Sequence, residues 1–429
     1  MRVLRSITEN RQGRRVAPVN ADSLIHDIDR CPTPSHVVAL WADRLVAQGF
    51  LEANDLLSPS PKAGFVRRSG LLLAWRNMDE FGARGARLIG AHTDSPGLHL
   101  KPNPNRMSLH HGQLSVEVYG SPILSSWFDR DLGVAGTVAG RDKVERLIHI
   151  DRPIARLPHL AIHLDREIND RGHVVDRHRH LSPVWSVEPA DVTNVIADAA
   201  GIAVVDIDAM SVQLVDVQPG TRLGRNSEFI SSPRLDNQVS CWAAMHALLA
   251  QETDQPSMVV LFDHEEVGSS SPDGAASAIV EHVLESLVYV VGGSRTNYLT
   301  GVSKSTLLSM DNSHGVHPNH PEKHDLDNAP MIGGGVAVKV NVNQRYSTSP
   351  RSLPVVADAA RRAGIALQRF SSRNDVGCGS TIGPIAATRL GIDTVDVGVP
   401  QWSMHSIREL VHANDVESLA RLAAAYLSR

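Results

Sequence analysis

Histidine and carboxylate side chains that could bind metal ions recur along the chain in five short motifs. The first motif places His92 and Asp94 two positions apart, directly after the apolar run 87–91. His92 could ligate a metal while Asp94 accepts the hydrogen of its second ring nitrogen and so fixes its tautomer. A His–x–Asp pair at the end of a strand is also a common polar turn, so this motif alone does not establish a metal site.

The second motif places two adjacent glutamates, Glu265 and Glu266, after the apolar run 258–262. Neighbouring carboxylates repel each other unless a positive group neutralises them, and a divalent cation does this well. One glutamate could then bind the metal while the other takes a proton from metal-bound water. A solvated acidic loop is the alternative interpretation of this motif.

The other three motifs each supply one further candidate ligand. Asp236 precedes a helix predicted at 237–250, so capping of that helix is the alternative role of its carboxylate. Asp311 follows the apolar pair 307–308, and His405 follows the last predicted strand. A single histidine in such a position is usually a packing residue. None of these three residues therefore establishes a metal site alone.

Taken together, these motifs predict one site, because they recur at the carboxyl ends of separate predicted strands, and such ends meet at one edge of a sheet. Nitrogen and oxygen ligands without thiolate are those of hydrolytic zinc sites that keep an open coordination position. Five ligands exceed what one catalytic zinc needs, so the simplest arrangement is a carboxylate that bridges two metals. The five candidates are His92, Asp236, Glu266, Asp311 and His405.

The elements that must position these motifs alternate between strands and helices. Apolar runs predict strands at 71–75, 87–91, 258–262, 287–291, 336–342 and 394–397. Apolar residues at helical spacing and the polar–apolar pattern predict helices at 34–50, 237–250, 350–363, 380–390 and 416–428. This alternation predicts an α/β fold with helices on both faces of a sheet.

The segment from about 101 to 230 differs in character. It contains a polar, histidine-rich run at 165–180, many Pro and Gly turns, and strand-like pieces at 114–119, 132–139, 159–164 and 212–217. The motifs before and after it belong together chemically. We therefore expect an inserted domain at 101–230 within a discontinuous catalytic domain formed by 1–100 and 231–429.

Composition excludes several classes of protein. The formal charge is −5, from 42 basic and 47 acidic side chains, and no block of Lys and Arg suggests a nucleic-acid partner. No window of 18 residues is apolar throughout, and the basic stretch 1–15 lacks the apolar centre of a signal peptide. We expect a cytoplasmic protein without membrane association, whose three distant cysteines are reduced.

Eight longer motifs together resemble the aspartyl aminopeptidases of metallopeptidase family M18, from about Cys31 to the C-terminus. They are HTDSPG at 92–97, WFDRDL at 127–132, RPIARLPHLAIHL at 152–164, DHEEVGS at 263–269, SMDNSHGVHPN at 309–319, VKVNVNQRY at 338–346, STIGP at 380–384 and MHSIRE at 404–409. The resemblance implies a zinc-aminopeptidase-like, three-layer α/β catalytic domain interrupted by a β-rich dimerisation domain. It also implies a homo-oligomer, a dodecamer built from dimers, that acts on peptides with an acidic N-terminal residue.

The resemblance also implies roles for individual residues. Asp236 would bridge two zinc ions, for which cobalt or manganese could substitute. His92 and Asp311 would complete one site, and Glu266 and His405 the other. Glu265 would be the general base and Asp94 would orient His92.

Four further residues match the family outside the metal ligands. Lys339 would pair with the acidic side chain of the substrate, although most strand lysines are simply solvated. His159 would reach the active site of a neighbouring subunit and help to stabilise the tetrahedral intermediate; without the resemblance it would be a polar loop residue. His314 and His317 would lie near the metals or contact the substrate. The first 30 residues have no counterpart in the family, and we expect a disordered or assembly-related arm there.

Three alternatives stay open. One is another two-zinc hydrolase, such as a broad-specificity aminopeptidase or an N-acyl deacylase, which would favour an apolar side chain where Lys339 lies. A thiol mechanism through Cys378 is disfavoured, because glycines flank it and no histidine is near it in sequence. The third is an inactive metal-binding assembly protein, which would have little need for Glu265.

Overall fold

A nine-stranded sheet forms the centre of the molecule in the computed structural model, which describes residues 20–53 and 57–428. Four central strands run parallel to one another, and the antiparallel β3 and β16 flank them. In spatial order the strands are β1 (Leu51–Glu52), β2 (Ala63–Arg67), β3 (Leu72–Arg76), β13 (Ser257–Phe262), β4 (Arg87–His92), β14 (Thr306–Met310), β18 (Asp393–Gly398), β16 (Val336–Lys339) and β17 (Leu367–Phe370).

Helices cover both faces of this sheet, because its central strands are apolar on both sides. On β13, Val259 and Leu261 face one hydrophobic core, and Met258, Val260 and Phe262 face the other. The first core includes α1 (Ala21–Arg30), α2 (Pro34–Ala47), α6 (Leu235–Leu249), α9 (Leu353–Ala363) and α11 (Ala413–Leu427). The second core includes α7 (Ile279–Val290) and α10 (Ile382–Leu390), and α3 (Phe81–Arg84) and α8 (Arg295–Ser303) lie at this side. The three-layer α/β architecture predicted from the sequence is confirmed.

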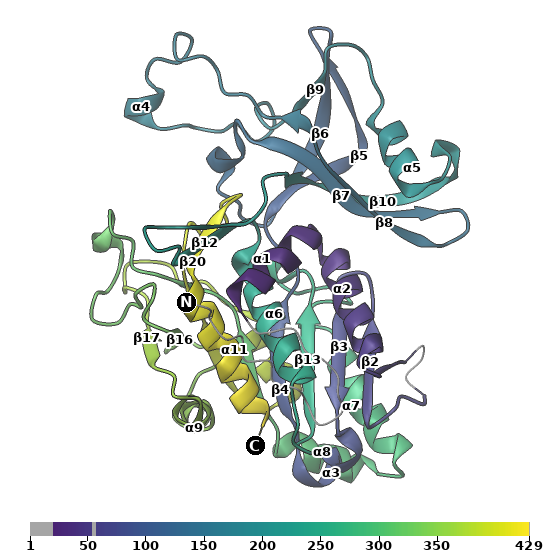
Figure 1. Ribbon diagram of the computed structural model, residues 1–429, viewed down its shortest axis with the longest axis vertical. Coiled ribbons are helices and arrows are strands. Elements are labelled where there is room, and N and C mark those ends of the chain that lie inside the picture. Colours follow the sequence, from purple (N-terminus) through teal and green to yellow (C-terminus); the bar gives the residue numbers. More distant parts are fainter. Residues whose placement is uncertain (1–19, 54–56, 429) are drawn as a thin grey trace, which may run out of the picture.

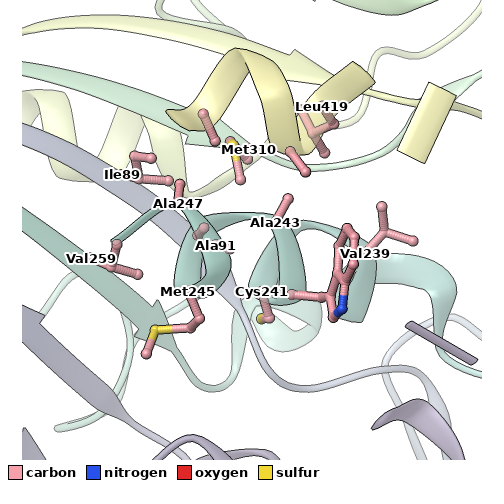
Figure 2. Packing of buried hydrophobic residues seen from close by; sticks show 14 of the residues in the cluster. Ile89, Ala91, Val239, Cys241, Ala243, Met245, Ala247, Val259, Met310 and Leu419 are labelled. Atoms are coloured by element: carbon pink, nitrogen blue, oxygen red, sulfur yellow. The ribbon is translucent and has the colours of Figure 1, made fainter. Parts of the chain in front are cut away.

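Small residues let α6 approach the sheet closely. Figure 2 shows Ala243 and Ala247 of α6 near Ile89, Ala91 and Met310, all of which are buried. Every residue of α6 is buried, so this helix lies between the sheet and the outer helices rather than at the surface. Its first turn is thereby held beside the carboxyl ends of the strands.

Residues 97–216 form a separate closed barrel, seen above the α/β part in Figure 1. Its strand order is β10 (Ile207–Asp216), β5 (Gly97–Ser108), β6 (His111–Tyr119), β9 (Val184–Ser186), β8 (Glu145–Arg156) and β7 (Asp131–Gly140). Helix α5 (Val192–Ala200) contributes Val192 and Ile196 to the apolar core of the barrel, and the short α4 (Ile168–Arg171) lies in the long loop between β8 and β9.

A five-stranded sheet lies between the barrel and the α/β part. Its order is β11 (Thr221–Leu223), β12 (Phe229–Ser232), β20 (Glu409–His412), β19 (Pro400–Trp402) and β15 (Ser313–His314). The chain returns from the barrel through β11 and β12, and the loop between β19 and β20 carries His405. Among the helices of the described residues, none combines the length and the apolar composition that crossing a bilayer requires.

Three expectations from the sequence are wrong. The run 287–291 is not a strand, because it ends the helix α7, where Val283, Leu284, Leu287 and Val288 form one buried face while Tyr289 is exposed. No strand forms at 159–164, where Leu160, Ile162 and Leu164 are exposed in a loop. Residues 21–30 are not an arm but the helix α1, which packs on the core, whereas residues 1–19 lie outside the described part.

Candidate metal centre

The carboxyl ends of three neighbouring parallel strands bring the candidate ligands together. His92 ends β4, Asp311 follows β14, and Glu266 lies in the turn after β13. Because β13, β4 and β14 are adjacent, these three side chains meet at one edge of the sheet. Asp236 joins them from the first turn of α6, and His405 from the loop after β19.

The carboxylate of Asp236 lies between two groups of possible ligand atoms. Its Oδ1 is 3.5 Å from His92 Nε2, which is 3.7 Å from Asp311 Oδ1. Its Oδ2 is 3.8 Å from His405 Nε2, which is 3.4 Å from Glu266 Oε1. The ligand atoms within each group lie within 4.8 Å of one another, and so do those of a third combination, His92, Glu265 and Glu266. The two groups match the two predicted sites, with Asp236 common to both.

These residues fit divalent metal ions. Two ligand atoms on one tetrahedral zinc lie roughly 3.4 Å apart, given metal–ligand bonds of about 2.0–2.2 Å, and the separations above are close to this. Asp236 Oδ1 is buried and has no hydrogen-bond partner within the described structure. Its carboxylate does not cap α6, whose N-cap is Arg234. A buried carboxylate oxygen without a partner is costly unless a cation compensates it.

The two adjacent glutamates also need a positive partner. Desolvation is the main cause that raises the pKa of Glu265 to about 8, and the negative charges of Asp311, Asp94 and Asp236 raise it further. Desolvation, followed by the charge of Asp236, raises the pKa of Glu266 well above its ordinary value. A divalent cation beside them would lower both pKa values and favour the charged carboxylates.

Asp94 lies behind His92, away from the other ligands. His92 Nδ1 donates to the backbone oxygen of Asp94 at 3.1 Å and lies 3.3 Å from its Oδ1. The backbone N–H groups of Glu265 and Glu266 donate to the same carboxylate at 3.1 and 3.0 Å. Asp94 thus connects the β4 motif to the turn after β13, and it leaves Nε2 of His92 directed at Asp236 and Asp311.

Sequence reasoning assigned no role to Glu409, although its motif was recognised. This buried carboxylate accepts hydrogen bonds from the backbone N–H groups of Asp236, at 2.9 Å, and His405, at 2.7 Å. It therefore ties two candidate ligands from distant segments to each other. The only local signal is a carboxylate four positions after His405, which by itself predicts nothing.

A cavity of about 410 Å³ opens beside the candidate ligands. Lys339 and His314 line it, together with Arg345 and Tyr346. Lys339 is buried, its Nζ is 3.5 Å from Asp311 Oδ2, and it lies 5.4 Å from the centre of the Tyr346 ring. The alternative of a solvated strand lysine is therefore wrong.

Besides Asp94, two predicted residues do not line this cavity. His317 hydrogen-bonds within its own loop, where its N–H donates to His324 Nε2 and its Nδ1 accepts from the backbone of Asn319. His159 lies in the barrel, where its Nδ1 donates to Asp129 Oδ2 at 2.7 Å and its Nε2 is 3.2 Å from His173 Nδ1. Within one chain, the structure does not bring either residue to the candidate metal centre.

Comparison with known proteins agrees with this geometry. The family described as Aminopeptidase I zinc metalloprotease (M18) matches residues 28–426. A probable M18 family aminopeptidase 2 from Streptomyces coelicolor is 41% identical over 420 residues, which cover 95% of this chain and 97% of the relative.

Solved structures show the same fold. A chain of the Ape4 and Nbr1 complex is 31% identical with a TM-score of 0.90, over 95% of this chain and 85% of that one. The S. cerevisiae mApe1 dodecamer is 27% identical with a TM-score of 0.81, over 95% of each chain. With its histidine and carboxylate groups at the strand ends, the chain belongs to the M18 family of zinc metallo-aminopeptidases.

Proposed function

We propose that this chain is a two-zinc aspartyl aminopeptidase, which hydrolyses single acidic residues from the N-termini of peptides. The observation that carries the proposal is the Asp236 carboxylate, whose two oxygens each face a different group of candidate ligands. His92, Asp236 and Asp311 would hold one ion, and Asp236, Glu266 and His405 the other. Bound zinc supplies a Lewis acid that polarises the scissile carbonyl and lowers the pKa of a water molecule.

Glu265 would move the proton in this reaction. It lines the cavity beside His92 and Glu266 and belongs to neither of the two groups that share Asp236. A carboxylate that is not a ligand can take the proton of the attacking water and return it to the leaving amine. Asp94 would hold His92 in the tautomer whose Nε2 is free for the metal.

Lys339 supports acidic side chains as the substrate class. Its ammonium group is buried in the wall of the cavity, next to the candidate ligand Asp311. A desolvated cation attracts a carboxylate strongly and disfavours an apolar side chain. His314 lies in the same wall and would contact the substrate.

The barrel would be the inserted dimerisation domain, with the catalytic domain formed by the segments before and after it. Its long loop between β8 and β9 presents exposed apolar side chains, namely Leu160, Ile162, Leu164 and Val174. His159 begins this loop and would act in the site of a neighbouring subunit. We infer a cytoplasmic dodecamer built from dimers, in line with the mApe1 dodecamer, which has the same fold.

Aminoacyl chromogenic substrates test the substrate class directly. Wild-type protein should cleave Asp and Glu derivatives and leave Leu and Arg derivatives nearly untouched, and a chelator should abolish cleavage until zinc is restored. Lys339→Ala should lower kcat/KM for the acidic substrates by about 10–100-fold, since a charge-assisted hydrogen bond contributes about 1.5–3 kcal/mol. A preference for the Leu derivative would favour a broad-specificity aminopeptidase, and metal binding without any cleavage would favour an inactive protein.

A further inference from the structure

Three consecutive residues of the barrel, Tyr119, Gly120 and Ser121, approach the candidate metal centre from outside the α/β sheet. They end β6 and begin the loop that follows it. Tyr119 and Ser121 each form a hydrogen bond with a residue of the centre, and Gly120 passes close to a third. The three interactions are of different kinds: Tyr119 uses its side-chain hydroxyl, Gly120 fits because it has no Cβ, and Ser121 uses its backbone carbonyl.

Tyr119 holds the carboxylate behind His92. Its hydroxyl donates to Asp94 Oδ2 at 2.7 Å, which adds to the two backbone N–H groups that Asp94 already accepts. The Tyr119 ring stacks on His99 of β5, with ring centres 4.8 Å apart, so its position is set within the barrel. Asp94 is fully buried, and the Tyr119 hydroxyl connects it to the barrel by a hydrogen bond.

Gly120 and Ser121 contact the ligands of the second group. Gly120 has a positive φ of 66°, and a Cβ there would lie 3.2 Å from Glu266 Cβ. The Ser121 carbonyl can only accept, so His405 Nδ1 donates to it at 3.1 Å, and this leaves His405 Nε2 free for a metal. The backbone N–H of Ile123 donates to the His405 carbonyl at 2.8 Å, which fixes the same loop a second time.

We propose that residues 119–121 of the barrel are a positioning element that orients ligands of both metal sites. Tyr119 acts on the His92 site through Asp94, while Gly120 and Ser121 act on the Glu266–His405 site. The inference rests on the two-zinc function proposed above. It makes metal affinity a property of the barrel as well as of the α/β sheet, because groups that orient a ligand typically change metal affinity about 10–100-fold.

Tyr119→Phe tests the first contact, because it removes only the hydroxyl. Zinc titration of the metal-free protein against a chromogenic chelator should show one site weakened about 10–100-fold and the other within about threefold. Excess zinc should restore most of kcat. Tyr426→Phe is the matched control, since it removes a hydroxyl that bonds Thr306 far from the centre, and it should leave both affinities unchanged.

A double-mutant cycle separates positioning from packing. If Tyr119 acts through Asp94, Tyr119→Phe should have little further effect on zinc affinity in an Asp94→Asn background. Fully additive effects would overturn the inference. So would a variant whose metal-free melting temperature falls while both zinc affinities stay at the wild-type values, because that result would show a structural role alone.

Gly120→Ala tests the second contact, with Gly201→Ala as its matched control. Both glycines have nearly the same φ, 66° and 67°, but nothing lies within 4 Å of a Cβ at Gly201. The backbone strain is therefore equal, and only Gly120→Ala should weaken a zinc site. Equal zinc affinities in the two variants would overturn this part. A wild-type chain that binds no zinc would overturn the proposed function as well, whereas unchanged variants of a two-zinc wild type would overturn the positioning inference alone.

Discussion

The α/β part and the barrel contribute to the candidate site in different ways. The segments outside the barrel supply all five candidate ligands: three follow or end central strands that are buried on both faces, Asp236 lies in the first turn of α6, and His405 lies in the loop after β19. The barrel supplies none of them, but its residues 119–121 contact Asp94, Glu266 and His405 from behind. Ligand chemistry and ligand orientation thus come from two differently built parts of one chain.

Ion pairs connect the two parts at their junction. Asp216, at the end of β10, accepts from Arg130 at 2.6 Å and from Arg408 at 3.1 Å. Arg408 also donates to the backbone of Gln218, Pro219 and Ser231, so its guanidinium binds the segment by which the chain leaves the barrel. The loop that carries His405 is therefore anchored to the barrel on two sides. The difference between the two parts predicts which substitutions abolish catalysis and which only weaken metal binding or stability.

Glu265→Gln should give the largest effect, because it removes proton transfer without removing a ligand of either group that shares Asp236. We expect kcat to fall by about 10²–10⁴-fold, the usual contribution of a general acid–base residue. Zinc content should stay at the wild-type value, measured by atomic emission on the same preparation. Activity above a tenth of the wild type would mean that another group moves the proton.

His159→Ala should show whether the barrel also supplies chemistry to a neighbouring site. We expect kcat to fall by about 10²–10³-fold, as for the loss of one group that stabilises a developing oxyanion. Refolding or co-expressing this variant together with Glu265→Gln should recover part of the activity, because mixed assemblies then contain sites with both groups intact. Two inactive variants that stay inactive when combined would show that His159 does not act between subunits.

The smallest effect concerns stability, through a histidine buried in the α/β part. His246 of α6 lies between Trp41 and Trp242, its two ring nitrogens have no hydrogen-bond partner among the described residues, and burial lowers its pKa to about 4. The nearby Asp27 raises this pKa and Arg44 lowers it, and both effects are smaller than that of burial.

Between pH 6.5 and 4, the unfolded chain therefore binds a proton at His246 that the folded chain does not. Stability is complete above pH 6.5 and is lost as the pH falls toward 4, by about 2 kcal/mol at pH 5. In denaturant unfolding with a chelator present, His246→Phe should lack this part of the pH dependence. The exposed His178→Phe should behave like wild type. An unchanged acid limb in His246→Phe would contradict the assignment.

The sequence predicted the centre of the fold well, because continuous apolar runs mark strands that are buried on both faces. The strands at β3, β4, β13 and β18 lie within a residue or two of their predicted bounds. The run 287–291 was misassigned because a short apolar segment is equally compatible with the buried face of a helix, and the tertiary contacts of α7 decide between them. The strand at β16 ends at Lys339, three residues before the predicted end.

The candidate ligands could be predicted to meet, because each follows or precedes an element whose end is fixed by the sheet. The residues that hold these ligands in place through hydrogen bonds could not be predicted. Glu409 bonds the backbone of Asp236, 173 positions away, and Tyr119 bonds Asp94 across the boundary between the barrel and the sheet. No local pattern marks such a residue, since its role depends on where the folded chain places its partner.

Zinc content per chain tests the central claim most directly. Wild-type protein freed of loose metal by gel filtration should hold two zinc ions per chain. Asp311→Ala and His405→Ala should each keep one tightly bound ion, whereas Asp236→Ala should lose both, because its carboxylate faces both groups of ligands. A wild-type chain with a single ion, or an Asp236→Ala variant that keeps two, would contradict the account.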